Sequence, residues 1–266
     1  MPSLSDNRAD RESIFDRFEV DKFSLVAKRP SPRHVNNIRA VLPQGVQIYL
    51  SADPHSPVNL LPEGTEKLVT SGFRPVPHLA VRMFADEDEL DGFIQSLSKA
   101  GANQLFVIGG DVERPAGVLK SSLELLTGPL LHKHGVVEVG IAGYPEGHPQ
   151  LPDEVLEISL AQKIRAAEEG GIRIHIATQF CFHAESISKW INSLREQGFR
   201  NRIKVGIPGP SEVSTLLSYA TTCGVVTSAA QLQREAIGTE KREWTPNYLL
   251  EQLAEEFSKY DPGEVV

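Results

Sequence analysis

Short apolar runs rich in β-branched residues alternate with longer amphipathic stretches along most of this chain. Each short run is about five to seven residues long and is bounded by Gly, Pro or polar residues, which is typical of strands buried on both faces. Parallel neighbours need a crossover connection, usually a helix, so this alternation predicts a parallel α/β sheet. The predicted strands are 22–27, 46–51, 76–81, 104–108, 136–142, 172–177 and 203–207.

The stretches between these strands have the spacing of amphipathic helices. In 87–100 the side chains of Leu90, Phe93 and Leu97 fall on one face, after an acidic first turn and before Gly101. Repeated strand–helix units without a long linker favour a continuous α/β architecture. The other predicted helices are 153–170, 184–197 and 211–223.

Two architectures are compatible with these units: a (βα)8 barrel of the TIM type and an open, doubly wound sheet. A doubly wound dinucleotide-binding sheet would favour G-x-G-x-x-G after an early strand. The chain lacks this motif, and IGGDVERPAG at 108–117 has a different spacing. We therefore predict an α/β (βα)8 barrel, with 1–266 as a single barrel domain, 1–20 as an N-terminal extension and 227–266 as a helical C-terminal tail. The last strand is uncertain or missing, because a polar tail follows Val226.

The composition excludes several classes of protein. No apolar run approaches the roughly 20 residues of a membrane-spanning helix, and the polar N-terminus lacks the apolar core of a signal peptide. The formal net charge of −8 argues against a nucleic-acid partner. Cys181 and Cys223 are the only cysteines, so we expect buried small hydrophobes and no disulfide framework. We expect a cytoplasmic protein without a membrane partner, and its amphipathic helices permit a homo-oligomer.

In a barrel of this type, residues just beyond the carboxyl ends of the strands form the functional site. Loops that converge there can form a broad site for a large planar ligand. His148 is the most informative candidate, because Pro and Gly residues constrain its loop. The polar candidates at these positions are Ser51, Asp53, His78, Asp111, Tyr144, Glu146, His148, Thr178 and Gln179.

Several candidates also have a structural explanation. Asp111 could be a turn aspartate that bonds its own backbone, and Gly109 and Gly110 could serve only a tight turn. His78 could be a satisfied core histidine. Gln179 needs hydrogen-bond partners if it is buried, and a bound heterocycle would provide them.

Other chemistries lack their motifs. The eight histidines are scattered and form no HxH or HExxH pattern, so no metal site is expected. The chain also lacks the G-x-S-x-G of Ser–His–Asp hydrolases and the P-loop of nucleotide hydrolases.

Two motifs resemble the methylenetetrahydrofolate reductase family: IAGYPEGHP at 141–149 and, about thirty residues later, ATQFCF at 177–182. VPHLAVR at 76–82 and FVIGGD at 106–111 resemble the ends of that family's third and fourth strands. The resemblance extends over roughly residues 20–225. It implies a (βα)8 barrel that reduces 5,10-methylenetetrahydrofolate to 5-methyltetrahydrofolate, or the reverse. FAD would lie across the carboxyl face, where the small-molecule folate and the nicotinamide cofactor, NADH or NADPH, would take turns stacking on it.

The resemblance also implies roles for single residues. Asp111 would be the catalytic residue, because it would hold the pterin ring and stabilise the iminium cation that accepts hydride. Gln179 would contact folate or nicotinamide, and Phe182 would contact the folate. The residues implied at the cofactor are Ser51, His78, Gly109, Gly110, Tyr144, His148, Lys163 and Arg165.

Some positions depart from the family's pattern. Val26 stands in place of a strand-one glutamate that acts as general acid toward folate, and a valine cannot deliver a proton. Gly109 replaces an arginine, and the basic cluster of the following helix is reduced to Lys163 and Arg165, with Ala167 behind them. These changes remove charge-assisted bonds to a pyrophosphate. We therefore expect FAD to bind weakly or not at all, in which case NAD(P)H would pass hydride directly to the folate.

Two questions stay open at this level. If opening of the methylene bridge needs a proton, Glu146, Asp53 or water would have to supply it. The alternative function is a non-redox tetrahydrofolate-binding barrel, or a methyl-transfer partner, that has lost catalysis. The valine on strand one favours this alternative, whereas the retained Asp111 and YPEGHP loop weigh against it.

Overall fold

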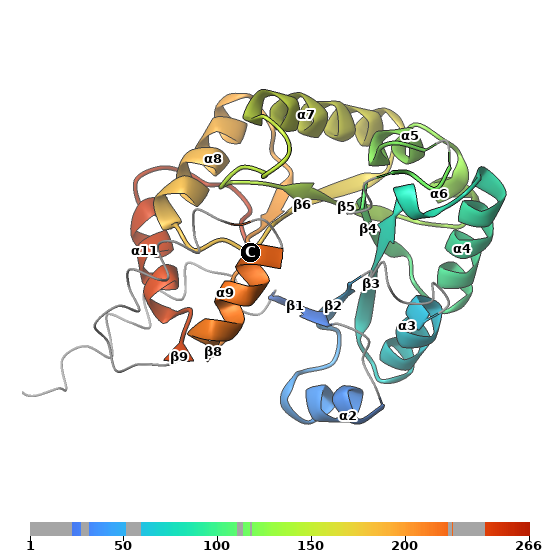
Figure 1. The fold of residues 1–266 in the computed structure, drawn as a ribbon, viewed down its shortest axis with the longest axis horizontal. Helices are drawn as coiled ribbons and strands as arrows, with labels where there is room; N and C mark the ends of the chain where they lie inside the picture. Colours follow the sequence, from blue (N-terminus) through green and yellow to red (C-terminus); the bar gives the residue numbers. More distant parts are fainter. Residues whose placement is uncertain are drawn as a thin grey trace, which may run out of the picture. The chain divides into compact units, whose positions relative to one another are not determined.

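The computed structural model describes residues 23–27, 32–51, 60–110, 114–117, 119–222, 225 and 243–266. Seven strands form one sheet in the order β1-β2-β3-β4-β5-β6-β7 (Figure 1), and the pairs from β1–β2 to β4–β5 are parallel. The strands are β1 Ser24–Ala27, β2 Gln47–Leu50, β3 Arg74–Ala80, β4 Gln104–Ile108, β5 Glu138–Gly143, β6 Arg173–Thr178 and β7 Arg202–Lys204.

This strand order decides between the two architectures. In a TIM-type barrel the strands follow one another in chain order, whereas a doubly wound sheet reverses its order at a switch point. The observed order has no reversal. The predicted α/β class and TIM-type topology are therefore confirmed, and each predicted strand is present with its ends shifted by at most three residues.

The last residues of the sequence lie beside β7. Ile203 forms a parallel bridge with Val265, and its N–H donates to the carbonyl of Glu264 at 3.0 Å. Arg195 holds the approaching segment, because its Nε donates to the carbonyl of Pro262 at 2.6 Å. A single bridge on the far side of β7 occupies the place where a barrel has its eighth strand, in agreement with the expectation of an uncertain last strand.

The helices include the four that the sequence predicts and others that it does not. One boundary differs: the helix expected from 211 begins at Val213, because Ser211 and Glu212 pair as strand β8 with β9 (Glu243–Trp244). The helices are α2 Pro32–Val41, α3 Leu60–Thr70, α4 Glu87–Lys99, α5 Ser122–Leu126, α6 Leu130–Lys133, α7 Asp153–Glu169, α8 Ala184–Glu196, α9 Val213–Thr222 and α11 Asn247–Phe257, with the 3-10 helix η2 at Val81–Met83. Part of the predicted helical tail is therefore present as α11.

The caps of α4 show why local sequence predicts this helix well. The Oδ1 atom of Asp86 accepts a hydrogen bond from the N–H of Glu89 at 2.8 Å, which satisfies a first-turn amide. Gly101 ends the helix with φ +96°, a left-handed conformation that favours glycine. Between these caps, the apolar stripe that includes Leu90 and Leu97 is buried.

The chain divides into two compact units, which we describe separately. The N-terminal unit contains Lys22–Ala142 and Ser159–His175, and the C-terminal unit contains Gly143–Ile158 and Ile176–Val266. Strands β5 and β6 each begin in the N-terminal unit and end in the C-terminal unit.

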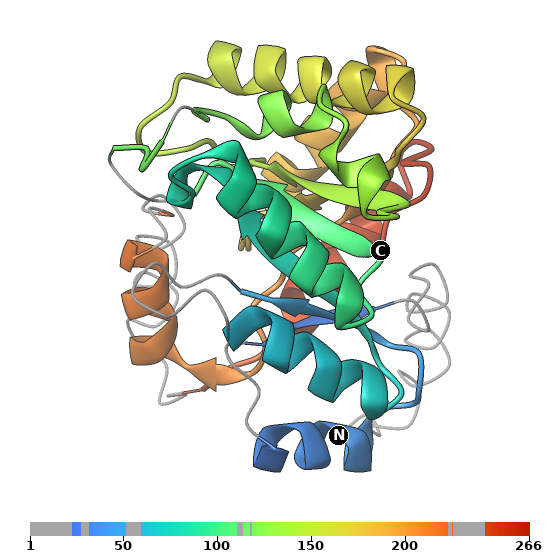
Figure 2. The ribbon, with the colours of Figure 1, turned by 90° about the vertical axis from the view of Figure 1, so that its right-hand side faces the viewer.

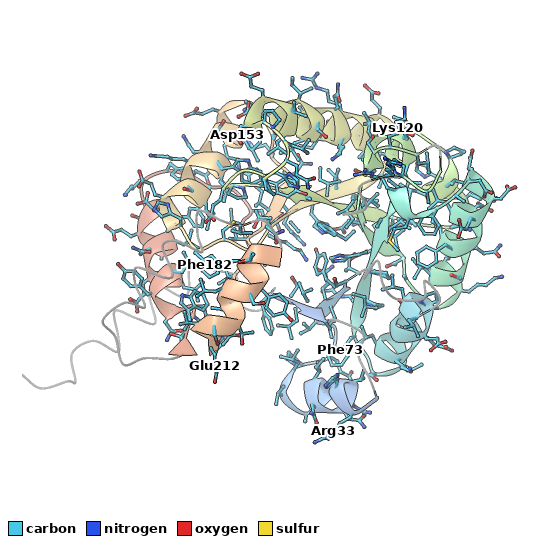
Figure 3. The ribbon with its side chains drawn as sticks, in the orientation of Figure 1. Arg33, Phe73, Lys120, Asp153, Phe182 and Glu212 are labelled. Carbon is cyan, nitrogen blue, oxygen red and sulfur yellow. The ribbon has the colours of Figure 1, made fainter. Side chains whose placement is uncertain are left out.

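In the N-terminal unit, α2, α3 and α4 cover one face of strands β1–β4 (Figure 1), and Figure 2 shows the three helices in front of these strands. Side chains alternate between the two faces of a strand. Ile48 and Leu50 of β2 point to the helices and join a buried cluster with Leu68 and with Phe73, which Figure 3 labels. The intervening Tyr49 belongs to the opposite face, which carries polar side chains.

In the C-terminal unit, α8 packs side by side with α11 (Figure 1). The hydroxyl of Tyr260 donates to the carbonyl of Ser188 at 2.9 Å and joins these two segments. Phe182, labelled near α9 in Figure 3, packs against Leu216 of that helix and against Trp244. Within the described ranges, none of the helices combines the length and the apolar character needed to cross a lipid bilayer.

Candidate functional site

In the N-terminal unit, a buried polar network lies on the face of the sheet opposite to helices α2, α3 and α4. The Nε2 atom of His175 is 2.6 Å from the hydroxyl of Tyr49, and its Nδ1 atom is 2.8 Å from Oε1 of Glu138. Gln104 donates to Oε2 of Glu138 at 3.3 Å, and Gln47 donates to Oε1 of Gln104 at 2.5 Å. These hydrogen bonds link strands β2, β4, β5 and β6, so the network is a structural element of the sheet.

Gly140 of β5 makes room for this network. A Cβ atom at this position would lie 2.5 Å from Nε2 of His175 and 2.7 Å from Cδ2 of Phe106. The His175 ring cannot move aside easily, because it is only 1% exposed and is held at both ring nitrogens. The ring of Phe106 is also buried. The glycine is therefore a packing requirement of the histidine on the neighbouring strand.

His78 of β3 lies next to the same rings. Its imidazole centroid is 4.7 Å from that of Phe106 and 6.1 Å from that of Tyr49. Burial lowers the pKa of His78 to about 4, so the ring is neutral at pH 7. A neutral imidazole has one donor and one acceptor nitrogen. His78 is half-buried against these rings, and its contact with a cofactor stays a prediction.

Val26 of β1 stands at the position where the resemblance implies an acidic residue. It pairs in register with Tyr49, so the two side chains point to the same face of the sheet. Val26 is 69% exposed there. Ser51 follows β2 nearby in the chain, and its N–H donates to the carbonyl of Ala27 at 3.2 Å. An exposed apolar side chain, without a proton to give, thus stands where the resemblance implies a glutamate.

Arg82 packs against the glycine turn that follows β4. Its N–H donates to the carbonyl of Gly109 at 3.0 Å, and its Nη1 lies 3.5 Å from the carbonyl oxygen of Gly110. A Cβ atom at Gly109 would lie 3.6 Å from Cδ of Arg82. Gly110 has φ +99°, and a Cβ there would lie 3.0 Å from Cβ of Ala80, so this position requires glycine. Arg82 therefore brings a cation beside the glycine that replaces the implied arginine.

Sequence reasoning missed Arg82, although a charged residue directly after an apolar strand is a visible signal. Asp111, the implied catalytic residue, follows Gly110 in the sequence and lies outside the described residues, as do Asp53 and Cys223.

The basic residues of α7 differ in their surroundings. Arg165 is exposed, whereas Lys163 is partly buried, and burial lowers the pKa of the Lys163 ammonium group. Ala167 is completely buried. A lysine at position 167 would therefore have to place its charge in the apolar core, which is strongly unfavourable without a partner.

In the C-terminal unit, a tight turn after β5 places Tyr144 beside His148. Gly147 has φ +80°, and its N–H donates to the carbonyl of Tyr144 at 3.1 Å. The rings of Tyr144 and His148 meet edge to face, with centroids 5.1 Å apart. The N–H of Gln150 donates to Nδ1 of His148 at 3.2 Å, so a neutral ring carries its proton on Nε2. The Pro/Gly loop thus orients the imidazole, and the contact of His148 with a cofactor stays a prediction.

Glu146 of the same loop binds main-chain amides after β6. Its Oε1 accepts hydrogen bonds from the N–H of Phe182 at 2.9 Å and of His183 at 3.0 Å. Burial raises the pKa of the Glu146 carboxyl, and the two amide hydrogen bonds act in the opposite direction. The sequence singled out Glu146 only as a source of a proton. It did not predict these hydrogen bonds, because a contact between two loops leaves no local sequence pattern.

Gln179 is anchored at the end of β6 and keeps one polar group available. Its N–H donates to the carbonyl of Gly143 at 2.8 Å, and its Oε1 accepts from the N–H of Phe180 at 3.0 Å. Within the described part of the chain, no partner is found for its Nε2 donor. The amide can therefore donate to a ligand that approaches the end of the strand.

The neighbours of Gln179 are packed into the unit. The Phe182 ring is 8% exposed, and its centroid lies 5.7 Å from that of Trp244. Cys181 is buried, and its N–H donates to the carbonyl of Gly206 at 2.9 Å. Burial first, and the charge of Glu146 second, raise the pKa of the Cys181 thiol well above its usual value. The prediction that Cys181 is a buried small hydrophobe is confirmed.

The candidate residues that the structure describes fall into two sets, one in each unit. Ser51, His78, Gly109 and Gly110 follow or lie in strands β2 to β4 of the N-terminal unit, to which Lys163 and Arg165 also belong. Tyr144, His148, Gln179 and Phe182 belong to the loops of the C-terminal unit. Among the residues described, no group of three or more His, Cys, Asp or Glu side chains is arranged to hold a metal ion.

Solved structures that match this chain include dihydropteroate synthase from Thermus thermophilus, with a TM-score of 0.44, 17% identity and coverage of 70% of this chain and 72% of that chain. A putative lyase/mutase from Burkholderia cenocepacia has a TM-score of 0.49 and 11% identity, and covers 77% and 76% of the two chains.

Two curated relatives are reductases. Methylenetetrahydrofolate reductase 2 of Saccharomyces cerevisiae is 25% identical over 138 residues, which are 49% of this chain and 22% of the yeast protein. The 5,10-methylenetetrahydrofolate reductase of Pectobacterium carotovorum subsp. carotovorum is 27% identical over 172 residues, which are 64% of this chain and 53% of that protein. The chain therefore spans about half the length of the bacterial relative and about a fifth of the yeast one.

The methylenetetrahydrofolate reductase family model matches residues 66–236. This range contains β3 to β7 and the loops that carry Tyr144, His148 and Gln179. Since it covers more than half of the sequence, the chain belongs to the methylenetetrahydrofolate reductase family.

Proposed function

We propose that this chain is a folate-dependent oxidoreductase that reduces 5,10-methylenetetrahydrofolate to 5-methyltetrahydrofolate with NADH or NADPH. Family membership over residues 66–236 supports the reaction class. The observation that carries the proposal is the joining of the loops after β5 and β6. Gln179 bonds to Gly143, and Glu146 bonds to the amides that follow Gln179, so Gln179 is held next to the Tyr144–His148 turn.

In this reaction a hydride passes from C4 of the nicotinamide to the one-carbon unit, and the folate nitrogen released from the bridge takes up a proton. Asp111 would stabilise the iminium cation that accepts the hydride. The side-chain amide of Gln179 can both donate and accept, which suits the edge of a pterin or of a carboxamide. The alignment of two flat heterocycles would supply much of the rate acceleration.

The residues implied at a flavin fit its pyrophosphate poorly. A pyrophosphate carries about two negative charges and is normally met by cations or by helix-terminal amides. Ala167 lies in the core, and Lys163 is partly buried on its helix. Arg82 adds a cation beside Gly109, but it does not replace both missing contacts. We therefore derive no step through FAD, and direct transfer between nicotinamide and folate is the mechanism that we propose.

The purified protein tests both parts of this proposal. We expect a colourless protein with little absorbance near 450 nm that oxidises NADH or NADPH when methylenetetrahydrofolate is added. Two lost charge-assisted contacts correspond to about two to four decades in affinity, so FAD titration should give a micromolar or weaker dissociation constant. A nanomolar constant would restore a flavin mechanism. Binding of folate without oxidation of the nicotinamide would make the chain a non-redox folate-binding protein.

The variant Asp111→Asn tests the catalytic assignment. It keeps the shape of the side chain but removes the charge that would stabilise the cation. We expect turnover to fall by about ten- to a thousandfold, which corresponds to roughly 1.4–4 kcal/mol of transition-state stabilisation. Wild-type turnover in this variant would make Asp111 a turn residue.

A further inference from the structure

Glu146 binds the start of α8 from a different loop. One of its carboxylate oxygens, Oε1, accepts hydrogen bonds from two consecutive amides, those of Phe182 and His183, at 2.9 Å and 3.0 Å. His183 is the N-cap of α8, and its own Nδ1 accepts from the N–H of Ser186 at 3.3 Å. Amides at a helix start have no partner within the helix. Glu146 thus supplies the acceptor that this segment needs, and it does so across two loops.

The whole segment 179–183 is fixed through its main-chain amides. The N–H of Gln179 bonds to Gly143 at 2.8 Å, and that of Cys181 bonds to Gly206 at 2.9 Å. Phe180 donates to the side chain of Gln179 itself. Glu146 is the one ionisable side chain among these acceptors. Its removal would release two neighbouring amides at once. The main-chain bonds of Gln179 to Gly143 and of Cys181 to Gly206 would remain.

The same contacts fix one oxygen of Glu146 as an acceptor of hydrogen bonds. An oxygen that already accepts two N–H groups is held in the acceptor state, because a proton on that oxygen would compete with both hydrogen bonds. Oε1 points toward the protein main chain, where it bonds the end of the segment at Phe182 and His183.

We propose that Glu146 is a positioning residue for the folate reaction, which holds segment 179–183 so that the Nε2 donor of Gln179 meets the ligand. This inference rests on the proposed function. It assigns to Glu146 a role through the main chain and leaves the proton of the reaction to another group or to water.

The test uses two variants with opposite properties. In Glu146→Gln the side-chain carbonyl can accept the same two amides, but the group cannot act as an acid. In Glu146→Ala both amides lose their acceptor. A matched control is Glu157→Ala, which removes an exposed carboxylate from α7.

Two measurements are made on each variant of the full chain. For Glu146→Ala we expect the KM for methylenetetrahydrofolate to rise about tenfold or more, and the amides of 180–185 to exchange hydrogen about tenfold faster. For Glu146→Gln we expect kcat/KM within about threefold of the wild type, with an unchanged pH profile and nearly normal exchange. If the alanine variant does not fold, Glu146→Asp, which shortens the side chain, replaces it.

The outcomes separate this inference from the proposed function. If the wild type does not oxidise the nicotinamide with methylenetetrahydrofolate, the proposed function fails, while hydrogen exchange still reports on the two amides. Exchange that stays at the wild-type rate in Glu146→Ala overturns the positioning role. A loss of kcat in Glu146→Gln equal to that in Glu146→Ala, with normal exchange in the glutamine variant, also overturns it and makes Glu146 the acid.

Discussion

The two units use buried polar groups in different ways. In the N-terminal unit, side chains bond to side chains: His175 joins Tyr49 and Glu138 in the middle of the sheet. In the C-terminal unit, Glu146 bonds to main-chain amides, and Gln179 keeps its Nε2 without a partner among the described residues. A mutually satisfied network strengthens the packing of strands, whereas a loop fixed by its backbone can present its side chains to a ligand.

This contrast has a measurable consequence. Substitutions in the network of the N-terminal unit should lower stability, because each of them removes at least one buried hydrogen bond. Substitution of a side chain that is presented by a fixed loop should lower ligand affinity and leave stability nearly unchanged.

The largest effect is expected for His175→Phe. The side chain stays a flat aromatic ring, somewhat larger than imidazole, but Glu138 and the hydroxyl of Tyr49 each lose their hydrogen bond to position 175. Breaking a buried pair of this kind costs about 3–5 kcal/mol. Urea unfolding would measure the loss. The control is His132→Phe, which removes only an exposed contact to the carbonyl of Gly170 and should cost about 1 kcal/mol or less. Equal losses in the two variants would show that the network has no special role.

A slightly smaller effect is expected when the pH is lowered, through His78. Its pKa is about 4 in the folded protein and 6.5 in a solvated chain, so the unfolded state binds the proton first. The neutral ring therefore makes its full contribution to the free energy of unfolding above pH 6.5, and this contribution is lost as the pH falls toward 4. The loss at pH 4 amounts to about 3 kcal/mol, at 1.36 kcal/mol per pKa unit. The variant His78→Gln does not titrate, so its stability curve should be flatter in this window; identical curves would contradict the assignment.

Gly140→Ala tests the close packing around the network. The new Cβ would lie 2.5 Å from Nε2 of His175, so either a strand or the ring has to move. Overpacking of this kind costs about 1–3 kcal/mol. Gly92→Ala in α4 is the matched control, because nothing lies within 4 Å of its Cβ position. That helical position should gain up to about 1 kcal/mol from the same substitution. A stable Gly140→Ala protein would mean that the two rings have more space than the structure gives them.

Gln179→Leu should show the opposite behaviour to the three changes above. We expect the apparent KM for folate or nicotinamide to rise about tenfold, which corresponds to about 1.4 kcal/mol, while loss of the bond from the N–H of Phe180 lowers stability by about 1 kcal/mol or less. Steady-state kinetics and a thermal unfolding curve measure the two quantities on the same sample. A collapse of thermal stability with ligand affinity intact would make Gln179 a structural tie and would remove the difference between the units.

Local sequence was sufficient where an element carries its own signals. The seven strands were predicted because each is a short β-branched run with a clear boundary, and α4 was predicted because its cap, its apolar stripe and its final glycine are all contiguous. The helices α2 and α3 were not predicted. Helix α3 contains Pro62 and Gly64, which disfavour a helix, and it is held by the burial of Leu68 against the sheet.

The amino-acid sequence by itself determined the α/β class, the strand order to be expected of a barrel, and the motifs that identify the family. These features depend on residues close together in the chain or on a pattern repeated along it. The tertiary structure alone decided that Arg82 lies beside Gly109, that His175 joins Glu138 to Tyr49, and that Glu146 holds the start of α8. Those contacts join residues 27 to 126 positions apart. Their partners are selected by the register of the strands and by burial, and neither leaves a mark in the local sequence.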